Sequence, residues 1–212
     1  MKTVYQGLLS LHGPQHWWPA DTAFEVMIGA ILTQNTAWSN VERAIENLKG
    51  HGLTTARAIL DCGHLRLAEA LRPSGYFNIK ADRLRCFCQW YLSQGGMKAL
   101  QQRSTEQLRQ ALLAVKGVGP ETADDILLYA FDRPVFVIDA YTRRLFSRLG
   151  LIEGDEPYEQ LRRDFETTLQ KDASLFNEYH ALIVRHGKEV CRPNPSCGRC
   201  SLLGFCPSGS GL

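Results

Sequence analysis

Residues 112–130 read LLAVKGVGPETADDILLYA. Apolar residues recur at helical spacing on both sides of the short run KGVG at 116–119, and Pro120 suits the first turn of a helix. Glycine tolerates positive φ and has no side chain that would keep a ligand from the backbone. The stretch therefore predicts two helices joined by a tight turn, with Val118 packed inward and fixing the angle between them.

Two interpretations fit this turn. Glycine ends many helices, so the run is consistent with an ordinary turn between two helices. It also resembles a helix-hairpin-helix, in which N–H groups at the start of the second helix face a DNA phosphate without reading sequence. In this second interpretation the phosphate contacts come from Lys116, Gly117, Val118, Gly119 and Thr122.

The rest of the chain has the pattern of helices joined by short polar turns. The chain has 212 residues, of which 44% are hydrophobic, enough for one or two small lobes. The best strand candidate, PVFVID at 134–139, is too isolated to build a sheet. The sequence therefore predicts an all-α protein. Further helices are expected at 23–34, 40–50, 64–72, 78–94, 139–149, 156–170 and 173–189, and Asp21, Ser39 and Ser104 are expected N-caps.

Charge and hydropathy narrow the class of protein. The formal net charge of +2 neither requires nor excludes a nucleic-acid partner. No apolar run reaches the ~20 residues that span a bilayer. The N-terminal stretch MKTVYQGLLSLHG lacks the apolar core and cleavage site of a signal peptide. A cytoplasmic protein with reduced thiols and no membrane partner is expected.

Four cysteines lie close together in the run CRPNPSCGRCSLLGFC, residues 191–206. Thiolate sets of this density hold zinc or an iron–sulfur cluster. Zinc usually takes two close pairs, whereas here a single C-x-x-C pair is flanked by one more distant cysteine on each side, which favours the bulkier cluster. Zinc remains the alternative, and a disulfide in a secreted tail is a third interpretation that no signal peptide supports. The expected ligands are Cys191, Cys197, Cys200 and Cys206.

An acidic residue stands out in VFVIDAYTRRLFSRLG, residues 135–150. Asp139 follows an apolar stretch and opens a predicted helix. A carboxylate at this position can simply cap that helix. It can also serve as a fixed negative charge in a catalytic site.

KGVGPETA, VIDAYTRR and HGKEVC, in this order and followed by the four cysteines, resemble the endonuclease III family of helix-hairpin-helix DNA glycosylases. The resemblance implies two helical lobes with DNA bound between them, and a [4Fe-4S] cluster that shapes a DNA-contacting loop. The gap between the first two cysteines is one residue shorter than is usual in the family. The implied lobes are a six-helix barrel at 21–135 with the hairpin at about 105–132, and a second lobe made of 1–20 and 136–212 with the cluster loop at 191–206.

The family resemblance also assigns the chemistry. Members that cleave the DNA strand carry a nucleophilic lysine directly after the position of Pro120, where this chain has Glu121. Glutamate cannot form a Schiff base, so a monofunctional glycosylase without lyase activity is implied. Asp139 would stabilise the positive charge that develops on the sugar and orient or deprotonate the attacking water. Glu121 would either position water or serve as a carboxylate favoured by the helix dipole.

The damaged base must leave the stack, and a side chain must fill the gap. In the family the filler follows the first buried helix, which makes Gln34 and Asn35 the wedge candidates in this chain. HWWP, TQNTAW and RPSGYFNIKADRL together resemble the 3-methyladenine branch, which also has glutamate at the lysine position. The candidates for the base pocket are Trp17, Trp18 and Trp38, with Lys188 as a further DNA or pocket contact.

Indole rings suit an alkylated purine because a 3-methylated purine is cationic and leaves easily, and a cation–π contact contributes roughly 0.5–2 kcal/mol. Ordinary packing of the tryptophans over the lobe is the plainer interpretation.

Arg143 and Arg144 either support DNA binding or lie on an exposed helix face. The implied partners are duplex DNA with a damaged base and an AP endonuclease that processes the product. The protein itself is expected to be a monomer associated with the nucleoid.

Other functions remain open from the sequence. A uracil or T:G mismatch glycosylase of the same fold would need donors and acceptors matched to a pyrimidine. An adenine-excising mismatch enzyme is disfavoured, since its relatives carry a catalytic glutamate where this chain has Ala30 and a further C-terminal domain after the cysteines. A non-catalytic DNA-binding or redox-sensing iron–sulfur protein would have no need of Asp139.

Overall fold

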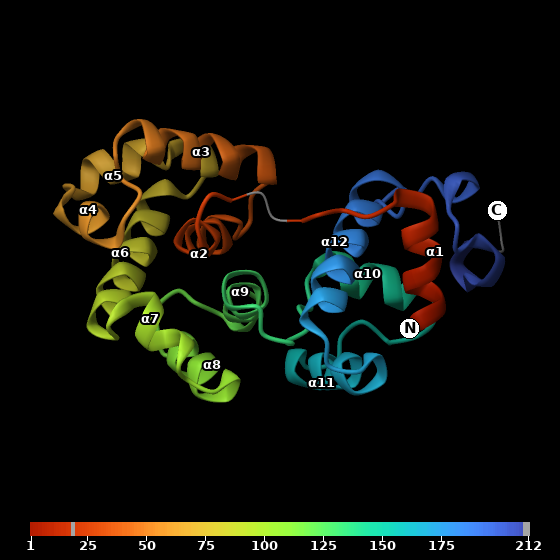
Figure 1. Cartoon of the computed structure of the whole chain (residues 1–212). Helices are drawn as coiled ribbons and strands as arrows, with labels where there is room; N and C mark the ends of the chain where they lie inside the picture. The colour runs from red at the N-terminus through yellow and green to blue at the C-terminus, as the bar shows by residue number, and fades with distance from the viewer. Residues whose placement is uncertain (18–19, 210–212) are drawn as a thin grey trace. The chain divides into compact units, whose positions relative to one another are not determined.

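A computed structural model describes residues 1–17 and 20–209, and in this part of the chain every regular element is helical and none is a strand. The predicted all-α class is therefore confirmed (Figure 1). The elements are α1 (Lys2–His12), α2 (Ala23–Leu32), α3 (Trp38–Gly50), α4 (Ala56–Asp61), α5 (His64–Ala70), η1 (Arg72–Ser74), α6 (Phe77–Ser93), α7 (Gly96–Gln101), α8 (Thr105–Leu113), α9 (Pro120–Asp125), η2 (Ile126–Ala130, a π-helical turn), α10 (Ala140–Arg148), α11 (Tyr158–Leu169), α12 (Ala173–Glu189), η3 (Cys197–Arg199), η4 (Leu203–Phe205) and η5 (Pro207–Gly209).

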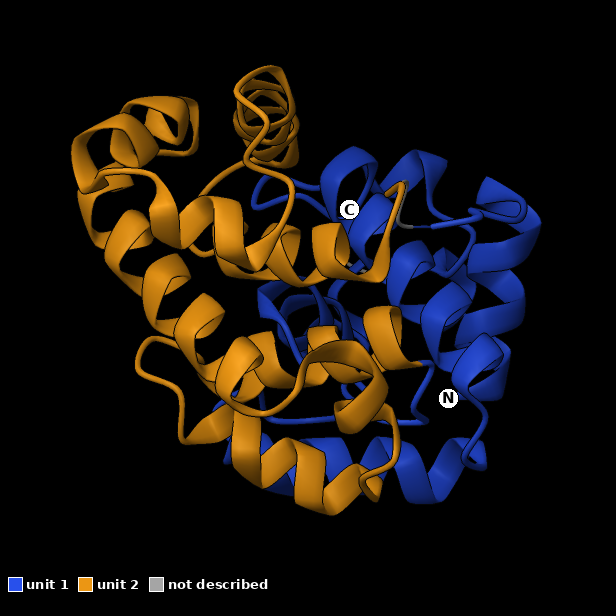
Figure 2. Ribbon diagram, turned by 60° about the vertical axis from the view of Figure 1, so that its left-hand side comes forward, with its two compact units in different colours: residues 1–19, 132–212 blue, residues 20–131 orange. Residues whose placement is uncertain are grey.

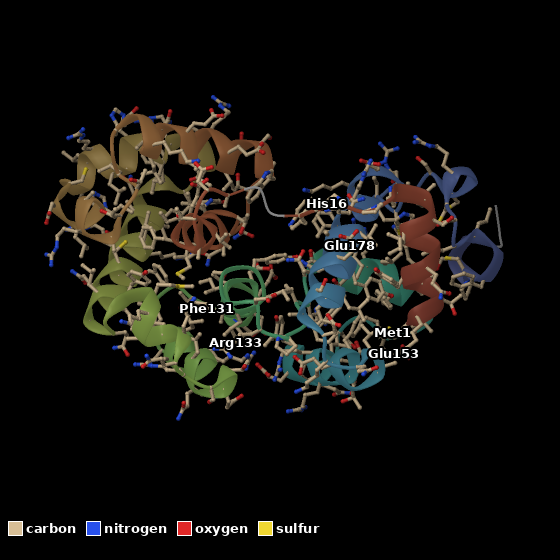
Figure 3. All side chains as sticks on the ribbon, viewed as in Figure 1. Met1, His16, Phe131, Arg133, Glu153 and Glu178 are labelled. Carbon is tan, nitrogen blue, oxygen red and sulfur yellow. The ribbon has the colours of Figure 1, made fainter. Side chains whose placement is uncertain are left out.

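The chain folds into two compact units, which Figure 2 distinguishes by colour. Unit 1 comprises residues 1–19 and 132–212, and unit 2 comprises residues 20–131. Phe131 and Arg133, both labelled in Figure 3, mark the passage from unit 2 back into unit 1. None of the helices in the described residues is long and apolar enough to cross a bilayer.

Unit 2 is built around α2, whose residues from Val26 to Leu32 are all buried. It packs against α3, α6, α9 and η2. The C-terminal end of α2 is closed by Lys80, a buried side chain whose Nζ donates to the carbonyls of Leu32 at 2.9 Å and Ser74 at 2.5 Å. Burial, with the nearby charge of Arg83, lowers the pKa of Lys80 to about 8. The lysine thus satisfies one carbonyl at the end of α2 and one at the end of η1, where helix ends leave carbonyls without partners.

Two of the three predicted N-caps were wrong. Thr22, not Asp21, caps α2 by accepting the N–H of Glu25, and Asp21 instead pairs with Lys49 at 2.7 Å. α3 begins one residue before Ser39, with Ala37 at its N-cap position. The third cap is confirmed, because Ser104 accepts the N–H of Gln107 and completes a capping box at the start of α8.

Unit 1 has an aromatic core. Phe136, from the extended connection before α10, packs its ring 4.6 Å from that of Phe165 on α11 and 5.3 Å from that of Phe176 on α12. Phe146 on α10 meets Phe165 at 4.7 Å, measured between ring centroids. Such aromatic pairs stabilise the fold by more than the burial of their surface area alone. The packing fixes the connection that leads directly into Asp139 and the start of α10.

Candidate active site

Asp139 is the N-cap of α10 and is buried, with its side chain 11% exposed. One carboxylate oxygen, Oδ1, accepts the N–H of Thr142 at 2.7 Å. The other, Oδ2, lies 3.5 Å from Nε2 of His180 on α12. The capping interpretation of Asp139 is therefore correct, and the second oxygen has a separate partner.

The surroundings of Asp139 favour the ionised form of its side chain. Burial on its own would raise the pKa of the carboxyl, but His180 and the N–H and hydroxyl of Thr142 outweigh it and hold the pKa below its usual value. A buried, ionised carboxylate held from two sides is suited to stabilising positive charge on a reacting sugar. It is also correctly charged to act as a base toward water.

His180 is the residue that the sequence did not reveal. It is 5% exposed and comes from α12, which packs against α10. Its partner lies on another element 41 residues earlier in the numbering, at Asp139. The available signal was its position on the buried side of a predicted helix, where most histidines are only core residues.

The tryptophan and lysine candidates divide between the units. In unit 1, Nζ of Lys188 lies 5.5 Å from the ring centroid of Trp17, a cation–π contact. In unit 2, Trp38 donates its Nε1–H to Glu42 of its own helix at 2.8 Å. Trp18 lies outside the described residues. The structure thus brings Trp17 and Lys188 together and places Trp38 in the other unit.

Trp17 also lines an open cavity of about 800 Å³ in unit 1. The labelled residues His16 and Glu178 line the same cavity (Figure 3). The cavity is large enough for a purine, because small-molecule sites range from about 300 to 1,000 Å³.

The hairpin forms as the sequence predicts. Val118 is buried at 7% exposure and turns inward between α8 and α9. Gly117 has a φ of +92°, and a Cβ there would stand 2.4 Å from Cγ of Arg83, so both conformation and space require glycine. Lys116, Gly119 and Glu121 are exposed. The outer side of the turn is thus open to a ligand.

A buried ion pair ties the two hairpin helices together. Arg109 on α8 donates to both oxygens of Asp124 on α9, at 2.7 and 3.0 Å. The two side chains are 5% and 0% exposed. This bidentate geometry fixes the register of α8 against α9 as well as their distance.

Gln34 supports the hairpin from inside unit 2. Its Nε2 donates to the carbonyl of Gly117 and to the hydroxyl of Thr122, each at 2.9 Å, and Arg83 donates to its Oε1. Thr122 is itself buried, so its side chain faces Gln34. Asn35, in contrast, is exposed and has a φ of +54°. Of the two wedge candidates, Asn35 is the one presented to solvent.

Arg143 and Arg144 have structural contacts within unit 1. Arg143 donates to the carbonyls of Gly154 and Glu156 at 3.0 and 2.8 Å. Arg144 donates to the carbonyls of Cys191 at 2.8 Å and Gly187 at 2.9 Å. The interpretation of an exposed helix face is wrong for both, because Arg143 binds the connection before α11 and Arg144 binds the last turn of α12 and the residue Cys191 after it.

The four cysteines line one cavity of about 250 Å³ in unit 1. Burial raises the pKa of Cys200, and Cys191, Cys206 and Cys197 lie near enough to add to that rise. Four thiols around one cavity are the kind of donor set that an iron–sulfur cluster takes. Among the described residues, no group of three or more His, Cys, Asp or Glu side chains is spaced to hold a metal ion.

A strained aromatic residue stands out in unit 2. Tyr76 precedes α6 with a φ of +46° and is 68% exposed. A non-glycine residue in the left-handed region costs free energy, and such strain concentrates at functional positions. The sequence places this tyrosine between Gly75 and Phe77, but only the structure shows that its ring is turned to solvent.

The fold and the site define a class, an all-α protein with a glycine hairpin, a buried carboxylate at a helix start and a four-cysteine loop. Comparison with known proteins gives the family. Residues 28–171 match the model of the HhH-GPD superfamily of base excision DNA repair proteins. The chain belongs to this superfamily, and the protein is a DNA N-glycosylase.

Individual relatives agree with this assignment. The chain is 48% identical over 208 residues to "Putative DNA repair glycosylase MJ1434" of Methanocaldococcus jannaschii, covering 97% of this chain and 94% of that protein. It is 32% identical to H. pylori 3-methyladenine DNA glycosylase (MagIII), solved with 1,N6-ethenoadenine, with a TM-score of 0.76 over 88% of this chain and 96% of that one. A non-covalent endonuclease III–DNA complex shares the fold, with a TM-score of 0.84, 20% identity and coverage of 99% and 95%.

Proposed function

We propose that this protein is a monofunctional DNA glycosylase that removes an alkylated purine such as 3-methyladenine and leaves the DNA strand intact. The observation that carries the proposal is the buried, ionised carboxylate of Asp139, combined with glutamate in place of a nucleophilic lysine after Pro120. The substrate class is supported by 32% identity to a 3-methyladenine DNA glycosylase over most of both chains.

In this mechanism Asp139 acts on a nucleotide already flipped from the duplex. As the glycosidic bond lengthens, positive charge builds on the sugar and the carboxylate stabilises it. The same carboxylate orients the attacking water and takes up its proton. His180 holds Oδ2 and Thr142 holds Oδ1, so the carboxylate needs little reorganisation during the reaction.

The absence of a lyase step follows from Glu121. This exposed residue lies in the first turn of α9, where a carboxylate is favoured by the helix dipole. An amine at this position would attack the sugar and form a Schiff base, whereas a carboxylate cannot. The product is therefore an abasic site in an unbroken strand, which a separate AP endonuclease would process.

Selection of a cationic base rests on Trp17. Nζ of Lys188 lies 5.5 Å from the centroid of this indole, a contact in which the ring already faces one positive charge. The face of an indole ring is suited to a cationic purine, because the ring quadrupole attracts positive charge. A neutral pyrimidine would gain only stacking. Trp18 and Trp38 remain further candidates for the pocket.

The hairpin would hold the DNA backbone at Lys116, Gly117 and Gly119, with N–H groups at the start of α9 facing a phosphate. Val118 and Thr122 face the interior of unit 2 and would shape the turn rather than touch DNA. The four cysteines would hold a [4Fe-4S] cluster, which shapes the surrounding loop. We expect a monomer in the cytoplasm, associated with the nucleoid.

Tyr76 and Asn35 would enter the DNA stack. Replacing Tyr76 with Ala should weaken binding to lesion-containing duplex by roughly 10-fold or more, since stacking of a base on an aromatic ring contributes about 1–3 kcal/mol. Fluorescence anisotropy with a labelled duplex measures the affinity. Leu65→Ala is the matched control, because Leu65 is 83% exposed in the same unit. Equal affinities of both variants and the wild type would remove Tyr76 from the DNA interface.

An assay of strand breaks tests both the monofunctional activity and the substrate class. Purified protein is incubated with methylated duplex DNA and with uracil and T:G duplexes, and breaks are counted with and without alkali. The proposal predicts breaks in methylated DNA only after alkali. Breaks without alkali would contradict the monofunctional assignment, and breaks confined to the uracil or T:G duplexes would contradict the substrate class.

A further inference from the structure

Two buried histidines connect a half-exposed carboxylate to the cysteine loop. His186 on α12 is fully buried, with Nε2 3.5 Å from Sγ of Cys200 and Nδ1 3.0 Å from Nε2 of His12. His12 ends α1, and its side chain is 4% exposed. Its other nitrogen, Nδ1, lies 3.7 Å from Oε2 of Glu189. These contacts form one series, Glu189–His12–His186–Cys200.

The chemistry of a ligating sulfur gives this series a direction. A cysteine bound to iron is a thiolate, which accepts hydrogen bonds and has no proton to donate. Nε2 of His186 must then carry the hydrogen that faces Cys200. In a neutral imidazole the other nitrogen is an acceptor, so Nδ1 of His186 accepts from Nε2 of His12. His12 thereby selects the tautomer of His186, although it does not itself touch the cysteine.

α1 also contacts the cysteine loop directly. The hydroxyl of Ser201 donates to the carbonyl of Gly7 at 2.8 Å. Gly7 also leaves room for Leu202, whose Cδ2 lies 2.6 Å from where a Cβ of residue 7 would stand. Leu202 is completely buried and lines the cysteine cavity. The helix that carries His12 is thus held directly against the two residues that follow Cys200.

We propose that His186 and His12 are positioning residues for the iron–sulfur cluster. His186 fixes Cys200 as a ligand by donating a hydrogen bond to its sulfur, and His12 holds His186 in the tautomer that can donate it. The inference rests on the proposed cofactor. Partners outside the ligand set orient metal ligands, and their loss typically weakens metal binding about 10–100-fold. Hydrogen bonds to the sulfurs are also among the factors that set the reduction potential of a cluster.

The test uses the full-length protein purified with its cluster. His12→Leu removes the donor to His186, whereas His12→Gln keeps an amide N–H near the same place. His186→Gln probes the direct contact with Cys200. His64→Leu is the control, since His64 pairs with Asp82 in unit 2, whereas the four cysteines at 191–206 belong to unit 1. Iron content, the visible absorbance of the cluster, its rate of decay in air and its reduction potential are measured for each protein, with circular dichroism to check folding.

His12→Leu should lose the cluster about 10-fold faster than the wild type and shift its potential to more negative values, since an electron-rich sulfur disfavours reduction. His12→Gln should restore most of both properties, and His64→Leu should match the wild type. Equal decay rates and potentials for folded His12→Leu, His186→Gln and wild type would overturn the inference. If the wild-type protein contained no iron, the inference and the proposed cofactor would both be wrong. The glycosylase function would still be tested separately, by measuring base release.

Discussion

Replacement of Asp139 with Asn should lower the rate of base release by about 10³-fold, because the carboxylate carries the charge that opposes the developing positive charge on the sugar. The low pKa of Asp139 means that the wild-type group is ionised throughout the neutral range. Asparagine keeps an oxygen for the N–H of Thr142 and is as good an N-cap as aspartate. The fold should therefore be preserved while the charge is lost. Single-turnover kinetics on lesion-containing duplex measure the effect.

A matched control separates charge at the site from charge in general. Asp164 lies on the exposed side of α11 in the same unit, so Asp164→Asn makes the same chemical change away from the site. It should leave the rate unchanged. The catalytic assignment fails if Asp139→Asn retains more than a tenth of the wild-type rate, with DNA binding and melting temperature unaltered.

Replacement of Asp124 with Ala should have the largest effect on stability, about 3–5 kcal/mol, because it leaves the buried guanidinium of Arg109 without its bidentate partner. Since the pair joins α8 to α9, the hairpin should lose its geometry, and DNA affinity should fall with it. Urea denaturation gives the change in the free energy of unfolding, and binding to undamaged duplex gives the change in affinity.

Two further variants make this prediction specific. Replacing both Arg109 and Asp124 with Leu should lower the free energy of unfolding much less than Asp124→Ala does, since a buried ion pair can often be exchanged for apolar residues. Glu69→Ala breaks an exposed pair with Arg72 and should leave the denaturation midpoint unchanged. If Asp124→Ala lowered the free energy of unfolding by less than 1 kcal/mol, the hairpin would not depend on the buried ion pair.

Local patterns were sufficient for the hairpin and for α12, whose bounds match the expected 173–189. They were sufficient because glycines, a proline and apolar spacing act over a few residues. They were insufficient for the start of α2, where Asp21 and Thr22 are both good caps and the pairing of Asp21 with Lys49 decides between them. Element boundaries are set by such competition between neighbours.

The site shows the same division more sharply. Asp139 could be found from its position after an apolar stretch, but its partner His180 becomes visible only when α10 and α12 pack together. Gln34 was expected to enter DNA, yet its side chain is directed to Gly117 and Thr122, 83 and 88 residues away. Long-range hydrogen bonds of this kind leave no periodic trace in a single sequence.

Chromatography of the bases released from methylated duplex DNA tests the central claim most directly. The account predicts that the wild-type protein releases 3-methyladenine and that Asp139→Asn releases almost none. Absence of 3-methyladenine from the released fraction, with the protein folded and bound to the same duplex, would contradict the account.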